Sequence, residues 1–430
     1  MHHVDSANLE RHLRELTEQF GVRLAGSDAE KRAAAYVADR LSACGAAVSV
    51  ETFACHTRAV EDEQLDVFIG GRWQRFGCSL LGVSPGTEGR AIEAPLVFFD
   101  SHTEYARPDL AHLKGKAVVH LGSHIESRAH YRRLIEAEPA FLLFVDSRYP
   151  GALPLGEGLF PAYVAALGAR PVVSVAYMDA WNWKQDAASA ARLRVRGGRS
   201  EGVSQNVVAE FRAEDPLPGL LFVGAHHDTQ AGTAGADDNA SGVAGVLELA
   251  RVLAGEPRRR TVRLVSFGCE EQLSVGSAAY VRAHRRELDA AGGLMFNLDS
   301  YGSLMGWTIL LCNGPAGMGP FFTPFFERQG EWVRLDEALT PYTDHFPFAA
   351  AGLASAWLGR RNCEAGRFFH HRPDDDLSRV SPKVMATLLD AVAQSLAHLG
   401  RCEPPPFALR ADERQRPQIE AMWQDLFGGW

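Results

Sequence analysis

Between residues 201 and 403 the sequence alternates between short apolar runs and longer amphipathic segments, and this alternation limits the fold more than any other feature. The clearest pairs are the run 219–228 before the segment 240–255, and the run 261–268 before the segment 275–291. A long amphipathic segment also begins at Ser381. Strands that alternate with helices form a mostly parallel sheet covered on both faces. The sequence therefore predicts a three-layer α/β/α sandwich around a mostly parallel mixed sheet.

The segment 59–200 has a different texture. It contains several short apolar runs separated by turns, and one helical stretch at 125–138. This pattern is typical of a β-rich unit. We therefore expect a smaller β-rich domain at 59–200, inserted into a larger domain made of residues 1–58 and 201–403. Residues 404–430 are expected to form a tail with a short amphipathic helix, which could pack on its own domain or on a second subunit of a homo-oligomer.

Composition argues against several classes of partner. The 430 residues carry a net charge of −9 without an extended Lys/Arg stripe, so nucleic acid is a poor candidate. No apolar run is long enough to cross a bilayer. The first 20 residues carry frequent charges, unlike a secretory signal. The seven cysteines are scattered and form no CxxC pair, which suits reduced thiols. We therefore expect a cytoplasmic protein that does not bind membranes.

Acidic and histidine side chains follow the predicted strands where each strand ends. His226 and Asp228 follow one strand, Glu270 and Glu271 follow a second, and Asp299 follows a third. The carboxyl ends of parallel strands meet at one edge of a sheet. So many carboxylates cannot be buried side by side unless cations compensate their charge. The sequence therefore predicts a site for cations at this edge.

Two further segments could complete such a site. Asp237 and Asp238 begin a predicted helix, where an aspartate could also be only a cap. His371 precedes Asp375 by four residues, and His226 likewise has an acidic residue close by. An acidic neighbour of this kind fixes the tautomer and direction of a metal-binding imidazole. Mixed imidazole and carboxylate ligands suit zinc, with cobalt or manganese as alternatives.

Five motifs in this order resemble those of a known family. They are GAHHD (224–228), GADDNASG (235–242), CEEQLSVGS (269–277), NLDSYG (297–302) and HHRPDDDL (370–377). Their succession resembles the co-catalytic dizinc exopeptidases, which include zinc aminopeptidases, glutamate carboxypeptidase, glutaminyl cyclase and the transferrin receptor. Residues 21–45 are similar to the N-terminal helices of that family, and the segment 59–200 resembles a protease-associated domain.

The resemblance implies a ligand set for two zinc ions. His226 and Asp299 would hold one ion, while Glu271 and His371 would hold the other. Asp238 would bridge both ions. Two such ions share a water molecule, lower its pKa and polarise the carbonyl that is attacked.

The resemblance also implies roles for residues that bind no metal. Glu270 would act as the general base that takes a proton from water and delivers it to the leaving amine. Asp228 and Asp375 would orient the two histidines, and Asp237 would only begin its helix. Tyr342 corresponds to a position from which the family places residues near the oxyanion, although an aromatic residue there could simply pack.

The expected activity is that of a zinc-dependent aminopeptidase that releases N-terminal residues from peptides. A carboxypeptidase or an amidohydrolase acting on small amides is the main alternative. It would need a cation for the substrate carboxylate, and Arg360, Arg361 or Arg367 could provide one unless they are exposed loop charges. Trp181 and Trp183 could cover the pocket or only pack on the surface of the inserted domain.

Two other functions are less well supported by the residues. A glutaminyl-cyclase-like acyltransferase fits poorly because the full ligand set suits two metal ions where that branch uses one. A non-catalytic binding protein would be expected to lack ligands. The chain also departs from the family pattern at Leu273-Ser274, where Gly-Leu is usual, and at Arg372, where Thr is usual. We therefore expect a different loop shape beside the substrate pocket.

Overall fold

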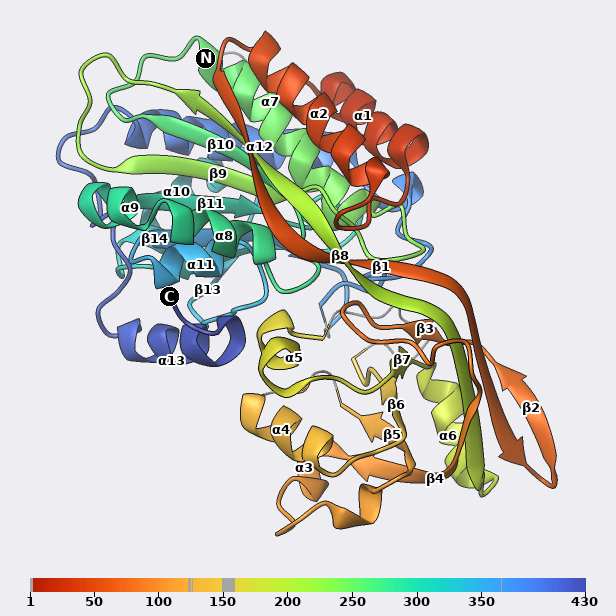
Figure 1. Cartoon of the computed structure of the whole chain (residues 1–430). Helices are drawn as coiled ribbons and strands as arrows, with labels where there is room; N and C mark the ends of the chain where they lie inside the picture. The colour runs from red at the N-terminus through yellow and green to blue at the C-terminus, as the bar shows by residue number, and fades with distance from the viewer. Residues whose placement is uncertain (1–2, 123–124, 126, 149–158, 365) are drawn as a thin grey trace.

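The computed structural model describes residues 3–122, 125, 127–148, 159–364 and 366–430 (Figure 1). Its strands form one 14-stranded mixed sheet in the order β13-β12-β14-β11-β9-β10-β8-β4-β5-β6-β7-β3, with β1 paired to β2 and β8. No helix within the described ranges is long and apolar enough to cross a membrane.

A parallel group of strands forms the centre of the larger lobe. Neighbouring strands in this group are β10 (Val262–Phe267), β9 (Leu220–His226), β11 (Gly293–Leu298) and β14 (Ala354–Arg361). Beyond them lie β12 (Trp307–Asn313), antiparallel to β14, and β13 (Val333–Asp336), parallel to β12. The strands expected from the apolar runs are therefore present, and the mostly parallel mixed sheet is confirmed.

Helices cover both faces of this part of the sheet (Figure 1). Val223 of β9 packs in a core with helices on one face, whereas its neighbour Phe222 packs in a separate core on the other face. The first face carries α1 (Ser6–Arg14), α2 (Asp28–Ala43), α7 (Gly242–Ala254), α10 (Met318–Arg328) and α12 (Pro382–Leu399). The second carries α8 (Val275–Ala283), α9 (Arg285–Ala291), α11 (His345–Ala350) and α13 (Arg416–Phe427). The expected three layers are confirmed.

Serine side chains cap the starts of two helices. The Ser27 side chain accepts a hydrogen bond from the Glu30 backbone N–H at 3.2 Å, as a capping serine should. The Glu30 carboxylate reaches back to the backbone N–H of Gly26 at 2.7 Å. Ser381 caps α12 in the same way. The predicted helix at 275–291 is divided at His284 into α8 and α9.

Two long antiparallel strands run from the larger lobe into the smaller one. β1 (Ala47–Ile69) pairs with β8 (Ala190–Phe211) along almost its whole length. One end of β8 pairs with β10, and the other pairs with β4 (Ile92–Asp100). β8 is continuous although glycines and charged residues interrupt its apolar pattern. The predicted domain boundaries fall inside these strands, and the division into domains stays a prediction.

The smaller lobe contains strands and more helices than the sequence indicated. β4, β5 (Ala117–Leu121), β6 (Phe141–Val145) and β7 (Val172–Ser174) are parallel, and β3 (Ser79–Leu80) is antiparallel to β7. The helices described there are α3 (Ser101–Glu104), α4 (Arg128–Glu136), α5 (Pro161–Leu167) and α6 (Tyr177–Gln185). The expectation of a single helical stretch was therefore wrong, because α5 and α6 are short and lack a clear apolar stripe.

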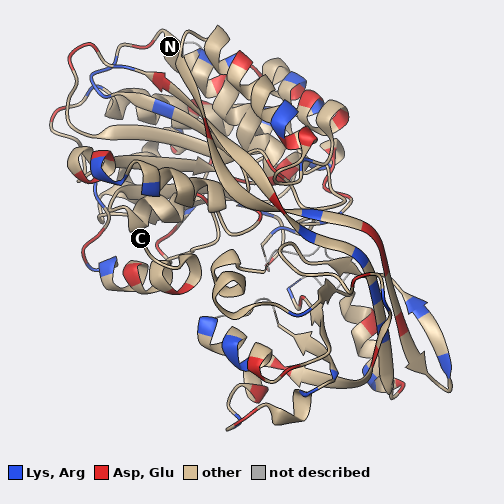
Figure 2. Cartoon of the chain, in the orientation of Figure 1, with Lys and Arg blue, Asp and Glu red and all other residues tan. Residues whose placement is uncertain are grey.

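Opposite charges alternate along the long strands and β2 (Arg72–Phe76), as Figure 2 shows. Arg194 pairs with Asp62 at 2.7 Å, and Arg75 pairs with Asp66 at 2.6 Å. Exposed pairs of this kind contribute at most about 1 kcal/mol each. These ion pairs neutralise the charges of Arg194 on β8 and Arg75 on β2 locally.

Candidate metal centre

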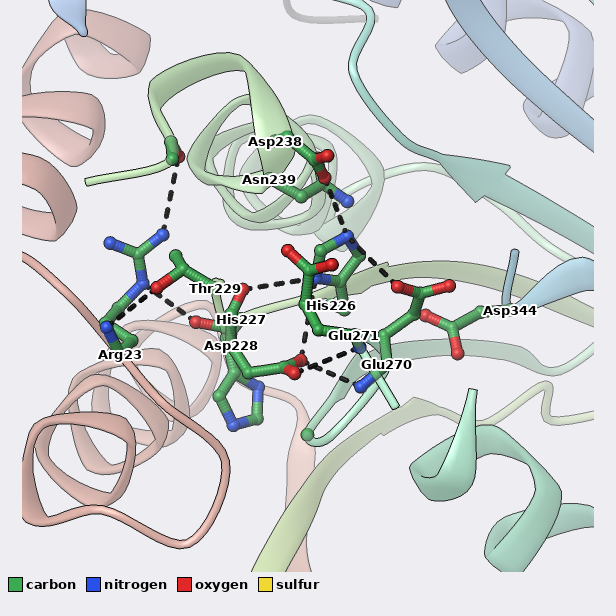
Figure 3. Close-up of polar contacts among 12 residues, drawn as sticks. Arg23, His226, His227, Asp228, Thr229, Asp238, Asn239, Glu270, Glu271 and Asp344 are labelled. Atoms are coloured by element: carbon green, nitrogen blue, oxygen red, sulfur yellow. Dashed lines mark hydrogen bonds and ion pairs between the residues drawn. The ribbon is translucent and has the colours of Figure 1, made fainter. Parts of the chain in front are cut away.

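The strand ends bring His226, Glu270 and Glu271 together with Asp238, as the parallel sheet requires (Figure 3). His226 is the last residue of β9, and Asp299 follows β11. Glu270 and Glu271 lie on the loop after β10, and Asp238 lies just before α7. All of these side chains are largely or completely buried.

The first group of donor atoms contains His226, Asp238 and Asp299. Nε2 of His226 lies 3.2 Å from Oδ1 of Asp238 and 4.0 Å from Oδ1 of Asp299. One donor atom from each residue lies within 4.8 Å of the other two. This spacing suits a single small cation held by three protein ligands.

The second group shares Asp238 with the first. Its other carboxylate oxygen, Oδ2, lies 3.5 Å from Nε2 of His371 and 3.4 Å from Nε2 of His370. Oε2 of Glu271 lies 2.9 Å from Nε2 of His371. The two oxygens of Asp238 therefore face two different sets of donors, as a bridging carboxylate does.

His370 is a candidate ligand that the sequence analysis missed. The sequence favours His371 as the ligand because Asp375 lies four residues after it. In the structure His371 has a φ of 51°, and its ring stacks on that of His370 with centroids 3.5 Å apart. Both imidazoles consequently approach Asp238, and the pair HH in the sequence was the available signal.

Electrostatics shows that the buried carboxylates carry more negative charge than Arg367 beside them compensates. Burial raises the pKa of Glu270 well above its ordinary value, and burial also raises the pKa values of Glu271 and Asp299. Burial alone would lower the pKa of His226, but Glu270 and other carboxylates raise it well above its ordinary value. Nε2 of His226 and Oε1 of Glu271 are buried, and neither atom makes a hydrogen bond of good geometry to any residue that the structure describes. These donors fit divalent cations, which supply the missing charge.

Glu270 differs from its neighbour Glu271 in its contacts. Its Oε1 accepts a hydrogen bond from the Ser274 hydroxyl at 3.1 Å, and its Oε2 lies 3.9 Å from Nε2 of His226. It therefore lies beside the first group of donors but belongs to neither group. Ser274, part of the unusual Leu273-Ser274 pair, thus contacts the carboxylate expected to act as the base.

Asp344 is a second residue that the sequence analysis missed. It is completely buried beside Glu270 (Figure 3), and its Oδ1 accepts a hydrogen bond from the Ser277 hydroxyl at 2.5 Å. Burial raises the pKa of Asp344 to about 7. No sequence signal marked it, because Asp344 comes from a distant loop that reaches the site only in the folded chain.

Asp228 and Asp375 hold the backbone of the site. Oδ1 and Oδ2 of Asp228 accept the backbone N–H groups of Glu270 at 2.9 Å and Glu271 at 3.1 Å, and Oδ1 lies 3.5 Å from Nδ1 of His226. The Asp375 carboxylate accepts the backbone N–H groups of Asp237 and Asp238 at 2.9 and 3.0 Å. Asp375 thus holds the segment that carries the shared carboxylate, and its orientation of His371 stays a prediction.

Asp237 does not join either group of metal donors. Its Oδ1 accepts the backbone N–H of Gly302 at 2.8 Å, which ties the segment before α7 to the loop after β11. This is the structural position expected for it, next to the start of a helix.

Arg23, which was not predicted, binds the backbone of the loops that carry the site residues (Figure 3). Its buried guanidinium donates to the backbone carbonyls of His227 at 2.8 Å and of Ala234 at 2.9 Å. Three more carbonyls, those of Leu16, Gly21 and Gly235, also accept from it. One arginine therefore links the N-terminal helices to both loops that carry ligands on this side.

The donors open into a cavity of about 230 Å³. Tyr342 lines this cavity and is 39% exposed, so it is placed to contact a substrate. Trp183 is instead buried in the core of the smaller lobe against Phe76, and Trp181 lines a separate cavity on α6. The suggestion that these tryptophans cover the pocket was wrong, because α6 packs them on another part of the sheet.

Comparison with known proteins supports the resemblance found in the sequence. Residues 206–396 match the profile of peptidase family M28. The aminopeptidase YwaD of Bacillus subtilis is 26% identical over 427 residues, which cover 96% of this chain and 88% of YwaD. This chain therefore carries a segment similar to the M28 peptidases and is similar to an aminopeptidase over nearly its whole length. The resemblance to the co-catalytic zinc exopeptidases is thus confirmed.

Solved structures agree with this fold along nearly the whole chain. The zinc aminopeptidase BSAP from Bacillus subtilis is 22% identical with a TM-score of 0.75, covering 94% of this chain and 98% of BSAP. The aminopeptidase from Aneurinibacillus sp. strain AM-1 is 21% identical with a TM-score of 0.74, covering 96% and 97%. The fold shared with these two structures therefore includes the long strands and the smaller lobe, whose relation to protease-associated domains stays a prediction.

Proposed function

We propose that this protein is a zinc-dependent aminopeptidase that removes N-terminal residues from peptides. The observation that carries the proposal is the pair of donor groups that share Asp238, one carboxylate oxygen facing each group. The similarity of residues 206–396 to the M28 peptidases and the similarity to the aminopeptidase YwaD support the same function.

Two cations would occupy the two groups of donors. His226 and Asp299 would hold one ion, Glu271 and His371 the other, and Asp238 would bridge them. His370 also lies close enough to Asp238 to compete with His371 as a ligand in the second group. Zn²⁺ suits this mixture of imidazole and carboxylate, and Co²⁺ or Mn²⁺ would be accepted by the same donors.

The ions would supply the charge that polarises the scissile carbonyl and makes water more acidic. Glu270 would then take a proton from the attacking water and return it to the leaving amine. Its raised pKa and its hydrogen bond from Ser274 suit a group that must hold a proton between these two steps. Tyr342, at the rim of the cavity, would donate its hydroxyl towards the oxyanion.

A carboxypeptidase or amidohydrolase with the same metal centre remains the second candidate function. It is favoured by the arginines that line the cavity, which could bind a substrate carboxylate. The two functions differ in which end of a peptide must be free.

A panel of peptides tests the proposal directly. One peptide sequence is offered with both ends free, with the N-terminus acetylated and with the C-terminus amidated, and products are identified by mass. We expect loss of cleavage only when the amine is blocked. Loss of cleavage only in the amidated peptide would select the carboxypeptidase instead.

The metal requirement is tested on the same preparation. We expect about two equivalents of zinc per chain, and we expect a chelator to remove both metal and activity. Full activity in a preparation without metal would refute the mechanism.

We also propose a cytoplasmic location and a protease-associated type of domain in the smaller lobe. The location is supported by the cysteines, all seven of which are free thiols in the structure. Cell fractionation would test it. A homo-oligomer is a further hypothesis, which light scattering would test.

A further inference from the structure

We infer that Arg361 binds a carboxylate of the substrate, so that the site prefers acidic substrates. The inference rests on the proposed peptidase function and names its substrate class. Four arginines line the cavity beside the metal donors: Arg148, Arg360, Arg361 and Arg367. Their contacts differ, and the difference singles out Arg361.

Arg360 is committed to the protein itself. Its guanidinium is buried and donates to the Ser303 carbonyl at 3.0 Å, the Gly306 carbonyl at 2.9 Å and the Thr308 hydroxyl at 2.9 Å. These bonds fix the ends of β12 and β14 against the loop after β11. Arg360 therefore has a structural role.

Arg367 and Arg148 already face carboxylates of the chain. Arg367 lies 3.2 Å from Oδ1 of Asp299 and 3.6 Å from Oδ2 of Asp238, so it compensates the metal-donor carboxylates. Arg148, on the side of the smaller lobe, pairs with Asp146 at 2.6 Å. Both arginines have much of their charge neutralised within the protein.

Arg361 is different, because its guanidinium makes no hydrogen bond or ion pair with any residue in the described ranges. It is partly buried at the end of β14 and lines the cavity. A partly desolvated guanidinium without a partner favours a ligand that offers a carboxylate, since the planar group binds both carboxylate oxygens at once.

The strand places Arg361 in line with the metal donors. Trp357, Gly359 and Arg361 alternate along β14 and line the same cavity. Nε1 of Trp357 donates to the backbone carbonyl of Asp299 at 2.9 Å, so the indole begins beside a metal donor. A Cβ on Gly359 would lie 2.8 Å from the indole, so the ring occupies the space that a side chain at this position would need. The floor of the cavity thus runs from Asp299 over the indole towards Arg361.

The size of the cavity limits what reaches Arg361. A volume of about 230 Å³ is smaller than the pockets that hold drug-sized ligands, so it suits one side chain or one short residue. The carboxylate could come from an N-terminal Glu or Asp side chain, or from the free C-terminus of a dipeptide. Both sources present the same chemistry to the same guanidinium.

Matched substrates separate the two sources. The metal-loaded enzyme is assayed with the p-nitroanilides of Glu, Gln and Leu, and with the dipeptide Ala-Gly and its amide. We expect kcat/KM at least tenfold higher for Glu than for Gln, or for Ala-Gly than for its amide. The first result assigns the carboxylate to the side chain, and the second assigns it to the C-terminus.

Substitution of Arg361 then tests the residue. We expect R361Q to lower kcat/KM for the preferred carboxylate substrate roughly 10- to 100-fold while that for the Leu anilide changes less than threefold. R361K should recover part of the loss, because it restores the charge without the planar geometry. R334Q, which removes an exposed arginine of β13, is the control and should leave both values unchanged.

Two results overturn the inference without touching the proposed function. One is a wild-type enzyme that cleaves the Leu or Gln anilide as well as the Glu anilide and ignores amidation of Ala-Gly. The other is a folded R361Q enzyme with an unchanged ratio of substrates. Failure to cleave any of these substrates or any free peptide would instead refute the aminopeptidase proposal.

Discussion

Asp375 offers a sharp test of how the metal centre is held, because sequence and structure suggest different roles for it. An aspartate four residues after His371 suggests a partner for that imidazole. The structure shows its carboxylate accepting the backbone N–H groups of Asp237 and Asp238. The first role affects only metal binding, whereas the second also stabilises the protein without metal.

The magnitude follows from the two hydrogen bonds. Each joins a buried N–H to a carboxylate, and bonds of this kind contribute about 1.5–3 kcal/mol. Burial raises the pKa of Asp375 well above its ordinary value, so part of this gain offsets the cost of burying the charge. We therefore expect D375A to lower the free energy of unfolding of the metal-free protein by roughly 2–4 kcal/mol.

The assay is urea unfolding in the presence of a chelator, followed by a zinc titration of each variant. D374A is the matched control, because Asp374 is partly exposed and pairs with Arg372 at 3.2 Å. It should cost at most about 1 kcal/mol. Without metal, the free energy of unfolding of D375A could instead lie within about 0.5 kcal/mol of the wild-type value. If only the zinc affinity then falls, the backbone role assigned to Asp375 is wrong.

Three further predictions follow from other parts of the molecule. E270Q should keep its metal content by elemental analysis but lower kcat roughly 10²- to 10⁴-fold, and full turnover would exclude Glu270 as the base. R23M should lower the free energy of unfolding by at least about 3 kcal/mol, because it leaves buried carbonyls unpaired, whereas R14M at an exposed arginine should cost under about 1 kcal/mol. Burial lowers the pKa of His12 to about 4 from 6.5, so the folded state binds this proton less tightly than the unfolded chain. Stability should therefore fall as the pH drops through this range, and H12Q should remove roughly 2–3 kcal/mol of that fall in urea titrations at several pH values.

The sequence alone determined the sandwich and most of the candidate centre. Both depend on local patterns, since apolar runs and caps report strands and helices directly. Residues at strand ends share an edge whenever the strands are parallel, and for this reason His226, Glu271 and Asp299 could be grouped without coordinates. Even the start of α2 at Ser27 was readable from a capping pattern within four residues.

Only the tertiary structure decided which distant side chains complete that centre. Asp344 and Arg23 come from segments far from the strand ends in sequence, and their burial beside the donors depends on how whole elements pack. The same holds for the arginines that line the cavity. The sequence does not show that the Arg360 guanidinium donates to backbone carbonyls, whereas that of Arg361 makes no such bond to the residues that the structure describes. Periodicity describes what one segment does, whereas a site is made by contacts between segments, and those exist only after folding.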